Sequence, residues 1–453
     1  SAWESPRPML PCGFVMWPNK ALLERDLWRT DILLWVSLGF VHISPALSSI
    51  ALGLFIFQLV FVGETVPMPG VQRWALFLMA MALCWNLLSL WDSAHTGLVT
   101  QSFVSDKAAA DLQTMALGKL LIKLPWMIVL GLYAAGRRLN TVLYRAWPVV
   151  VLPLLWIGVS SVIHYFQHRA FYDQMVLESK PIPLYSTVYH IEFAVMMGGV
   201  ILLMLHGLMQ GKVKDVFSRK LLILGVMMLV VCMHILGSRT GLILLYAGGS
   251  MMTLLFLKRQ LKQLVKVVLA GLLLLGGLTM LPSVQNRIAN TIEDLNTTVN
   301  GGDVTHQSFG QRWIAWNTAA AQLKKPLSAV MGYGVGVDDV LRDAYDKLSV
   351  RLAERHRIGV HNQWLEGAMQ SGWISFLSIL LLGFFAFGDG SLGGKTGGRS
   401  VWLALVMAMM FESLMERQAG ILVLIVVFQG LMHEKNGSNS EIKTEYALND
   451  ENK

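Results

Sequence analysis

The chain has 453 residues, of which 54% are hydrophobic and only 15% are charged, and its mean hydropathy is +0.52. A soluble chain cannot bury so large an apolar fraction, so the composition excludes an ordinary soluble domain and predicts a membrane protein. The net charge of +8 does not by itself indicate a nucleic-acid partner, because its meaning depends on where the basic residues lie. We expect no nucleic acid to bind.

Apolar runs long enough to cross a bilayer recur along the whole chain. A transmembrane helix needs about 17 to 25 mostly apolar residues, whereas an outer-membrane barrel shows short segments of alternating polarity. We therefore predict an all-α polytopic membrane protein with about twelve transmembrane helices. The predicted spans lie near 31–44, 46–62, 74–91, 117–135, 147–166, 188–209, 220–237, 240–257, 265–281, 361–387, 400–412 and 417–432.

The first two spans are the least regular part of this pattern. Residues Ile32 to Val62 form either two short helices broken at Pro45 or one long tilted helix. Residues 1–30 are polar and contain four prolines, so no cleavable signal is expected and this segment is predicted to remain in the mature protein.

The short basic loops predict the orientation of the spans. Loop 136–146 holds three arginines, and loops 210–220 and 258–266 each hold four Lys or Arg. Such loops stay on the cytoplasmic side, and an even number of predicted spans separates them, so the three assignments agree. Residues 1–30 and the polar tail 433–453 are then cytoplasmic as well, and the tail is expected to be disordered.

The connection 282–360, which we call the cap, separates the first nine spans (31–281) from the last three (361–432). It carries nine Lys or Arg and is too long for a simple connector. The predicted orientation places it on the outer side of the membrane. We expect it to form a small helical domain over the membrane helices.

Three helices are predicted within the cap. The first is an amphipathic helix on the membrane surface, with apolar side chains at helical spacing. A capping box formed by Ser308 and Gln311 is expected to open the second helix, which ends at Pro326. A glycine-rich turn at 332–336 precedes the third helix, from about Asp338 to Arg355. The predicted apolar faces are Val284, Ile288, Ile292, Leu295 and Val299 in the first helix, Trp313, Trp316, Ala320 and Leu323 in the second, and Leu341, Tyr345, Leu348 and Leu352 in the third.

Basic side chains at the predicted outer boundary of the membrane are the main candidates for chemistry. Arg239, within Gly237-Ser-Arg-Thr-Gly241, occupies a short turn between two helices, and its head group either faces a cavity or reaches toward the interface. Arg312 opens the Trp-bearing helix, where a guanidinium group either grips a phosphate with two hydrogen bonds or remains a solvated surface charge.

His361 and Asn362 begin the tenth span. An imidazole at a helix start beside apolar residues suits a proton acceptor, and the alternative is a structural histidine at the interface. Glu366 lies deeper in the same span and needs a partner there. His190 and Glu192, near the outer end of the sixth span, raise the same question.

Several other kinds of site are not supported by the sequence. It contains no HExxH, CxxC or DxD pattern, so we expect no metal, and nothing indicates another cofactor. The glycine-rich turn at 332–336 lacks the Lys-Ser/Thr of a P-loop, so no nucleotide is expected there either. Because the cap is predicted to face outward, a lipid-linked donor fits better than a cytoplasmic sugar nucleotide.

The order of these motifs resembles that of the bacterial O-antigen ligases and the related O-antigen polymerases. His361-Asn362, followed after nine residues by Gly372, looks like the signature of this family and departs from it at Ser375, where Gly, Thr or Tyr is usual. Gly237-Ser-Arg-Thr-Gly241 and Gln311-Arg312-Trp313 are also similar to family features, as is the plan of twelve spans with one large outer loop.

The resemblance implies a membrane-embedded glycosyltransferase of the GT-C type that needs neither a nucleotide nor a metal. The favoured member is an O-antigen ligase of the inner membrane, which transfers a glycan from undecaprenyl diphosphate to a lipid A-core acceptor. Arg239 and Arg312 would bind the donor diphosphate, and His361 would activate the acceptor hydroxyl. Asn362 would orient either the histidine or the donor. Further residues, Arg169, Trp313, Glu366 and Gly372, are expected to form the wall of the site.

Other functions remain open at the level of sequence. An O-antigen polymerase uses the same donor with a second lipid-linked glycan as acceptor, although it often has two sizeable loops with arginines, whereas the segment 167–187 is short. A protein-glycosylating enzyme would differ only in its acceptor. A polysaccharide or lipid transporter is a different class, in which Arg239, Glu192 and Glu366 would line a path across the membrane.

The orientation of the cap is directly testable. A single cysteine placed at Asp303 or Asp346 in a cysteine-free background should react with an impermeant thiol reagent in intact spheroplasts, because the basic loops place residues 282–360 outside the cytoplasm. Labelling that requires lysis of the cells would reverse the predicted orientation.

Overall fold

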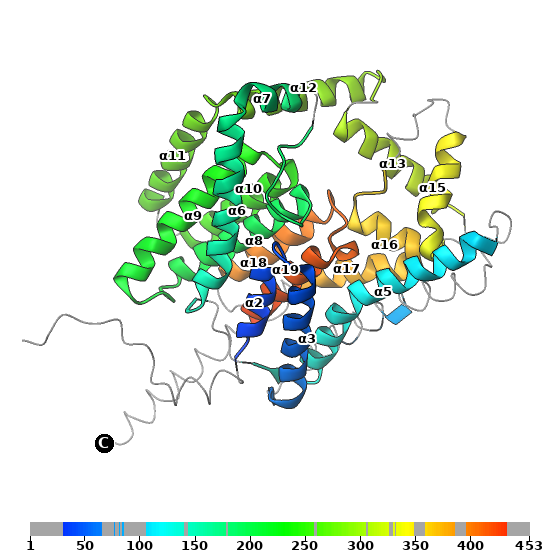
Figure 1. Ribbon diagram of the computed structural model, residues 1–453, viewed down its shortest axis with the longest axis horizontal. Helices are drawn as coiled ribbons and strands as arrows, with labels where there is room; N and C mark the ends of the chain where they lie inside the picture. Colours follow the sequence, from blue (N-terminus) through cyan, green and yellow to red (C-terminus); the bar gives the residue numbers. More distant parts are fainter. Residues whose placement is uncertain are drawn as a thin grey trace, which may run out of the picture.

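The computed structural model describes residues 30–65, 77, 81, 84–85, 106–139, 144–177, 180–257, 261–304, 307–325, 329–330, 332–347, 358–385 and 396–432. Residues 1–29, the tail 433–453 and most of the predicted span 74–91 lie outside this set. Helices dominate the described residues, and they confirm the prediction of an all-α polytopic membrane protein. Figure 1 shows a bundle of helices, with further helices lying across one of its ends.

The helices follow the predicted apolar runs closely. Their bounds are α2 Ile32–Phe40, α3 Pro45–Phe61, α5 Asp106–Ala134, α6 Trp147–Gln167, α7 Arg169–Leu177, α8 His190–Met209, α9 Val216–Leu236, α10 Arg239–Leu257, α11 Leu261–Leu278, α12 Pro282–Val299, α13 Ser308–Gln322, α15 Val337–Asp346, α16 Gln363–Ser371, α17 Trp373–Phe385, α18 Thr396–Ala408 and α19 Gln418–Met432, with short 3-10 helices η2 Gly334–Gly336 and η4 Leu414–Glu416.

Among the described residues, four helices are both long and apolar enough to cross a membrane by themselves. They are the segment Leu117–Ala134 of α5 and the whole of α6, α8 and α9. The first predicted pair consists of two helices, α2 and α3, separated by a turn, and Pro45 is the first residue of the second. Proline fits this position because its missing N–H would have no partner in the first turn of a helix.

The centre of the bundle is formed by α8 and α19. Most side chains of α8, and all of those described from Ala419 to Gln429 in α19, are buried. Helix α10 packs closely on α8 because Gly241 has no side chain, and a Cβ atom there would lie 2.6 Å from that of Ala194. Small residues allow such close approach between helices in a membrane. In the outer helices α5, α6 and α9, only about a third of the residues in the most apolar segment are buried.

A short antiparallel strand pair connects two distant loops at one end of the bundle. Strand β1 (Glu64–Thr65) follows α3, and strand β2 (Arg137–Arg138) follows α5. Glu64 pairs with Arg138, and Arg137 also donates a hydrogen bond to the carbonyl oxygen of Gly63 at 2.6 Å. The pairing puts the ends of α3 and α5 on the same side of the bundle, as the predicted alternation of spans two and four requires.

The predicted tenth span, 361–387, is not one helix. Gly372 separates α16 from α17, and with φ of 73° it adopts a backbone conformation that favours glycine. The two helices then fold against each other, since the rings of Trp364 and Phe376 lie 5.3 Å apart. In a continuous helix these rings, twelve positions apart, would be separated by about three turns. The prediction of a single continuous helix was therefore wrong.

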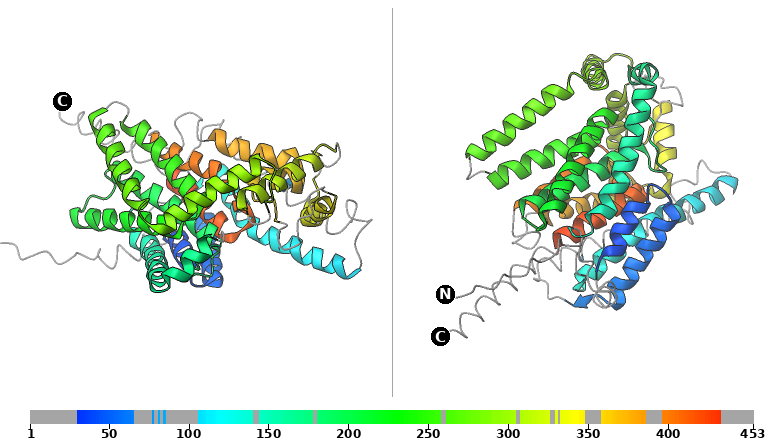
Figure 2. Two further views of the ribbon diagram at one scale, coloured as in Figure 1. Left: turned by 90° about the horizontal axis from the view of Figure 1, so that it is seen from above. Right: turned by 60° about the vertical axis from the view of Figure 1, so that its left-hand side comes forward.

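The cap contains the three predicted helical regions, with differences in their details. Helix α12 lies across the end of the bundle, beside α7, as seen in Figures 1 and 2. Of the predicted apolar face, it exposes Ile288, Ile292, Leu295 and Val299, whereas Val284 is half-buried. Helix α15 buries the predicted Leu341 and Tyr345 but ends at Asp346 instead of Arg355, and residues 348–357 lie outside the described set.

The packed face of α13 also differs from the prediction. Ala315, Ala319 and Leu323 are buried, whereas Trp313 is 48% exposed and Ala320 is exposed. The sequence analysis placed both indole rings on the packed face, but the alanines that pack instead allow α13 to lie closer to its neighbours. Trp316 is half-buried, and its Nε1 donates a hydrogen bond to the carbonyl oxygen of Val360 at 2.9 Å.

The break at Gly372 predicts a clear effect of substitution. Gly372→Ala should lower the free energy of unfolding by about 1–3 kcal/mol, because it forces a left-handed φ on alanine and brings a Cβ atom against the backbone of Val330. Chemical unfolding in detergent micelles measures this loss. Gly249→Ala in α10 is the control, since a Cβ atom there would meet no other atom within 4 Å, and a change below about 1 kcal/mol is expected. Equal effects at both positions would show that the break does not require glycine.

Candidate functional site

Arg239 is placed by the tight connection between α9 and α10. Gly237 ends α9 in a left-handed conformation with φ of 63°, and Arg239 is already the first residue of α10. The turn is therefore shorter than the predicted Gly237–Gly241. The side chain of Arg239 is 31% exposed, and its Nη1 forms an ion pair with Asp294 of α12 at 2.8 Å. The same nitrogen donates a hydrogen bond to Ser308 Oγ at 3.1 Å.

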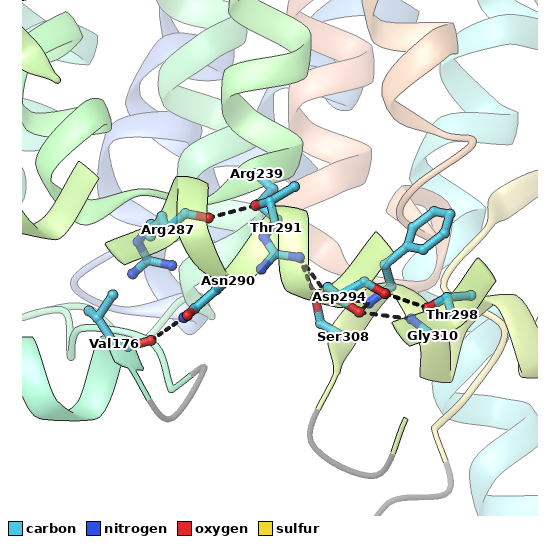
Figure 3. Close-up of polar contacts among 10 residues, drawn as sticks. Val176, Arg239, Arg287, Asn290, Thr291, Asp294, Thr298, Ser308 and Gly310 are labelled. Carbon is cyan, nitrogen blue, oxygen red and sulfur yellow. Dashed lines mark hydrogen bonds and ion pairs between the residues drawn. The ribbon is translucent and has the colours of Figure 1, made fainter. Parts of the chain in front are cut away.

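Asp294 is almost fully buried and joins three elements. Besides Arg239, it accepts hydrogen bonds from the backbone N–H groups of Phe309 and Gly310, at 3.0 Å and 3.1 Å, in the first turn of α13. Figure 3 shows Asp294 between the guanidinium group of Arg239 and this turn. A carboxylate is favourable at a helix N-terminus, where backbone N–H groups lack partners.

The predicted capping box of α13 is wrong, because the N–H groups at the start of this helix bond to Asp294. The residue preceding the helix is Gln307, with no side-chain cap, and Ser308 lies inside the first turn. Asp294, which belongs to α12, bonds to these N–H groups in place of a side chain at the start of α13. A local sequence pattern cannot reveal a cap supplied by a residue 15 positions away.

His361 and Arg312 share a second buried carboxylate, that of Glu412 in the turn after α18. His361 Nδ1 lies 3.0 Å from Glu412 Oε1, and Arg312 Nη2 lies 3.5 Å from Glu412 Oε2. Arg312 also donates from Nη1 to the carbonyl oxygen of Phe411 at 2.9 Å. The carboxylate thereby fixes the relative position of an imidazole from the start of the tenth span and a guanidinium group from the cap.

The geometry of His361 suits a base. With Glu412 accepting a hydrogen bond from Nδ1–H, the neutral ring carries its lone pair on Nε2. Within the described part of the chain, Nε2 has no hydrogen-bond partner, and the side chain is 31% exposed. The residue has φ of 46°, the one non-glycine position with positive φ among the described residues. Histidine is among the residues enriched in this conformation.

Arg287 of α12 is a third arginine at this site, and the sequence analysis did not identify it. Its Nη2 donates to the carbonyl oxygen of Leu236 at 3.2 Å, while its Nε is buried without a partner among the described residues. The side chain passes directly over Gly237, where a Cβ atom would collide with it. One signal was present, because Arg287 is the single Lys or Arg between residues 282 and 311.

One cavity of about 220 Å³ brings these groups together. Arg239, Arg287, Arg312 and His361 line it, along with His190 at the start of α8. The remaining lining residues, from α7, α8, α10, α12, α13 and the loops between them, are Val176, Pro181, Tyr189, Ile191, Gly237, Ser238, Thr240, Asn290, Ser308, Gln311 and Ile358. We call this space the polar cavity.

The other residues predicted for the site do not line the polar cavity. Asn362 accepts hydrogen bonds from the backbone N–H groups of Trp364 and Leu365 through its side-chain oxygen and thus caps α16. Arg169 pairs with Asp173 at 3.4 Å. Trp313 is half-exposed on α13, and Gly372 forms the break described above.

Glu366 belongs to a separate buried cluster. It accepts a hydrogen bond from Gln370, which in turn accepts one from Lys123 of α5. Lys123 also forms an ion pair with Glu416 at 2.7 Å. Glu192, which sequence reasoning had grouped with His190, pairs with Arg417 at 3.6 Å instead of facing the cavity.

The charges around the polar cavity favour an anion. Three guanidinium groups face two carboxylates, those of Asp294 and Glu412, so positive charge is in excess. Burial, together with the nearby charge of Arg239, lowers the pKa of Arg287 to about 10, which still leaves it charged at neutral pH. Burial also raises the pKa of Glu412, but the hydrogen bond from His361 and the charge of Arg312 outweigh it and hold the pKa below its ordinary value.

Comparison with known proteins agrees with the resemblance seen in the sequence. Residues 222–380 match the model of a family described as O-antigen ligase, which supports the assignment to the O-antigen ligase and polymerase superfamily. The matched segment includes Arg239, Arg287, Arg312 and His361, whereas Glu412 lies beyond it. Members of the family are glycosyltransferase-like enzymes of O-antigen and lipopolysaccharide processing. No curated protein matches the chain.

The joint role of Asp294 leads to a prediction on stability. Asp294→Asn should lower the free energy of unfolding by about 2 kcal/mol, because an amide loses the charge that supports both Arg239 and the first turn of α13. Chemical unfolding in detergent measures the loss. Asp339→Asn is the matched control, since this exposed carboxylate lies 3.8 Å from the exposed Arg342, and a change within about 0.5 kcal/mol is expected. Similar values for both variants would mean that Asp294 does not organise the site.

Proposed function

We propose that the protein is an O-antigen ligase that transfers a polysaccharide from undecaprenyl diphosphate to a sugar of the lipid A core. The reaction would take place at the periplasmic face of the inner membrane. The observation that carries this proposal is the polar cavity, in which three arginines lie beside a histidine held by a carboxylate. The family match supports the same class of chemistry.

The arginines account for the departure of the lipid diphosphate. When the bond between the anomeric carbon and the diphosphate oxygen breaks, the electron pair moves onto the diphosphate and negative charge grows there. Guanidinium groups stabilise this charge through paired N–H donors that match the phosphate oxygens. Arg287 and Arg239 lie close enough for one charge to lower the pKa of the other, so an anion between them would relieve their repulsion.

His361 accounts for the activation of the acceptor. A sugar hydroxyl is a weak nucleophile near neutral pH and gains from a positioned base. As the acceptor oxygen bonds to the anomeric carbon, its proton moves to His361 Nε2. Glu412 holds Nδ1–H and stabilises the imidazolium that forms. The positive charge on His361 and the negative charge on the diphosphate then arise within one cavity, where they attract each other.

Reconstitution tests the proposed function. The purified chain would be placed in liposomes with undecaprenyl diphosphate-linked glycan and, in separate reactions, lipid A core, a second lipid-linked glycan or an acceptor protein. Gain of mass by lipid A core alone supports the ligase. Gain by the lipid-linked glycan would identify a polymerase, and gain by the protein would identify a protein-glycosylating enzyme. Movement of intact donor between leaflets without transfer would identify a transporter.

Arg239→Lys should remove most transfer activity while the protein still folds. Lysine keeps the charge opposite Asp294 but lacks the additional N–H groups needed to grip phosphate oxygens in pairs. The measurement is the initial rate of transfer in the reconstituted system. Arg342→Lys, on the exposed surface of α15, is the control and should leave the rate unchanged. Near-normal turnover of Arg239→Lys would show that paired recognition by this residue is not required.

His361→Asn should lower the rate of transfer by about 10²- to 10⁴-fold, because the base is removed. Asparagine tolerates the positive φ of this position, and its amide can still donate to Glu412. Single-turnover transfer and binding of undecaprenyl diphosphate would be measured on the same preparation, with His168→Asn at the exposed end of α6 as control. Equal losses in binding and rate would place His361 among the diphosphate ligands, and unchanged kinetics would make it structural.

A further inference from the structure

Two aromatic side chains of the polar cavity are not used by the proposed reaction. Tyr189 and His190 line the cavity at the start of α8. The ring of Tyr189 is 54% exposed, and its centroid lies 4.1 Å from that of the His190 ring. Neither the tyrosine hydroxyl nor the imidazole has a hydrogen-bond partner among the described residues. Both rings can therefore meet a ligand without breaking a contact within the protein.

The backbone around Tyr189 is held on both sides. The carbonyl oxygen of Tyr189 accepts a hydrogen bond from the N–H of Phe193 at 2.9 Å, in the first turn of α8. Thr187 donates its backbone N–H to the carbonyl oxygen of His42 at 3.2 Å and its hydroxyl to that of Val41 at 3.1 Å. The turn after α2 thus fixes this segment. A ring on a fixed backbone loses little conformational entropy on binding.

The two rings lie beside the groups that would carry out the reaction. The charges of Glu412 and Arg312 act on both of them, and the charge of Arg287 also acts on His190. The arginines would hold the diphosphate, and Glu412 holds the base His361. The new bond between a sugar carbon and an acceptor oxygen must form between these two sets of groups. A sugar at this position would lie against the two rings.

The chemistry of this wall suits a sugar better than a simple anion. A sugar ring has an apolar face of C–H groups, which packs on an aromatic ring, and hydroxyl groups at its edge, which need hydrogen bonds. Tyr189 offers the aromatic surface, and a neutral imidazole at His190 both donates and accepts. Elsewhere in the lining, Ser238 Oγ is buried without a partner among the described residues. The wall thus combines an aromatic face with unpaired polar atoms.

From this arrangement we propose that Tyr189 and His190 bind a sugar ring next to the bond that is made, with the tyrosine on its C–H face and the imidazole on a hydroxyl group. This inference rests on the proposed function and adds a determinant of specificity to it. Both residues lie outside the segment 222–380 that matches the family model. They select the sugar, whereas the arginines and His361 of the matched segment carry out the transfer.

A comparable tyrosine on the same loop separates this role from a general one. An exposed tyrosine near the membrane boundary can also act as an interfacial anchor. Tyr185 is 57% exposed but does not line the polar cavity. Its ring instead contacts that of His164 in α6, with 5.4 Å between the centroids. An interfacial role would make the two tyrosines equivalent, whereas a sugar site requires only Tyr189.

The test measures how much a sugar adds to ligand binding by the purified full chain. Two pairs of probes are compared: undecaprenyl diphosphate with and without N-acetylglucosamine, and lipid A with and without its core oligosaccharide. In the unaltered chain, the sugar should raise the affinity within at least one pair by about tenfold, and we call this factor the sugar gain. The pair that shows it identifies the bound sugar as that of the donor or that of the acceptor.

Tyr189→Ala and His190→Phe should each remove most of the sugar gain, because one loses the aromatic face and the other loses the hydrogen bonds. Binding of the sugar-free probes should stay within about twofold. Tyr189→Phe, which keeps the ring, and the control Tyr185→Ala should both retain the sugar gain within about twofold.

Several outcomes would overturn the proposal. They are the absence of a sugar gain in the unaltered chain, a sugar gain that survives Tyr189→Ala or His190→Phe, and equal losses in Tyr185→Ala and Tyr189→Ala. A loss in Tyr189→Phe as large as in Tyr189→Ala would exclude the role of the ring face. Equal weakening of the sugar-free probes would show that the two residues do not act on the sugar.

A measurement on the unaltered protein covers the case in which the variants do not fold. Analogues with a diazirine on the N-acetylglucosamine or on the terminal core sugar are the probes, and at least one should crosslink to the peptide that contains Tyr189 and His190. Crosslinks of both analogues confined to other peptides would contradict the proposal. The binding assays do not depend on transfer. A sugar gain that Tyr189→Ala removes, without transfer on reconstitution, would refute the proposed function alone, whereas transfer with an unchanged sugar gain in Tyr189→Ala would refute this inference alone.

Discussion

The buried carboxylate of Asp294 needs compensation for its charge, because an unpaired charge is costly away from water. Its partners are Arg239 at the start of α10 and two backbone N–H groups of α13. One side chain thus joins a bundle helix, the helix that lies across the bundle and the next helix of the cap. These bonds fix the direction of α13. Arg312, near the start of this helix, therefore lies at the polar cavity.

The segment 409–417 between α18 and α19 supports the other side of the site. Gln363, at the start of α16, donates its backbone N–H to the carbonyl oxygen of Met409 and accepts a hydrogen bond from the backbone N–H of Met415. Glu412 binds His361 and Arg312, and Glu416 binds Lys123. These contacts join the end of the bundle, the cap and α5, so the position of His361 depends on packing well beyond the polar cavity.

The sequence predicted the helices more successfully than the contacts between them. Apolar runs predicted the described helices because burial in lipid imposes a length and a composition on each span. The break at Gly372 was missed, since hydropathy does not change at a single glycine. Arg239, Arg312 and His361 were predicted as site residues and line one cavity. Asp294 and Glu412 were not, because pairing between residues 51 to 100 positions apart leaves no local pattern. Asn362 caps α16 and does not line that cavity.

The place of Glu412 in the chain has a consequence for biogenesis. It follows His361 by 51 residues and Arg312 by 100, and membrane helices are inserted in the order of their synthesis. While α18 and α19 are still within the ribosome, the newly made chain already displays its arginines, but His361 has no carboxylate to set its tautomer. The turn between α18 and α19 therefore completes the site, and an unfinished chain in the membrane holds the three arginines of the polar cavity beside a histidine that no carboxylate orients.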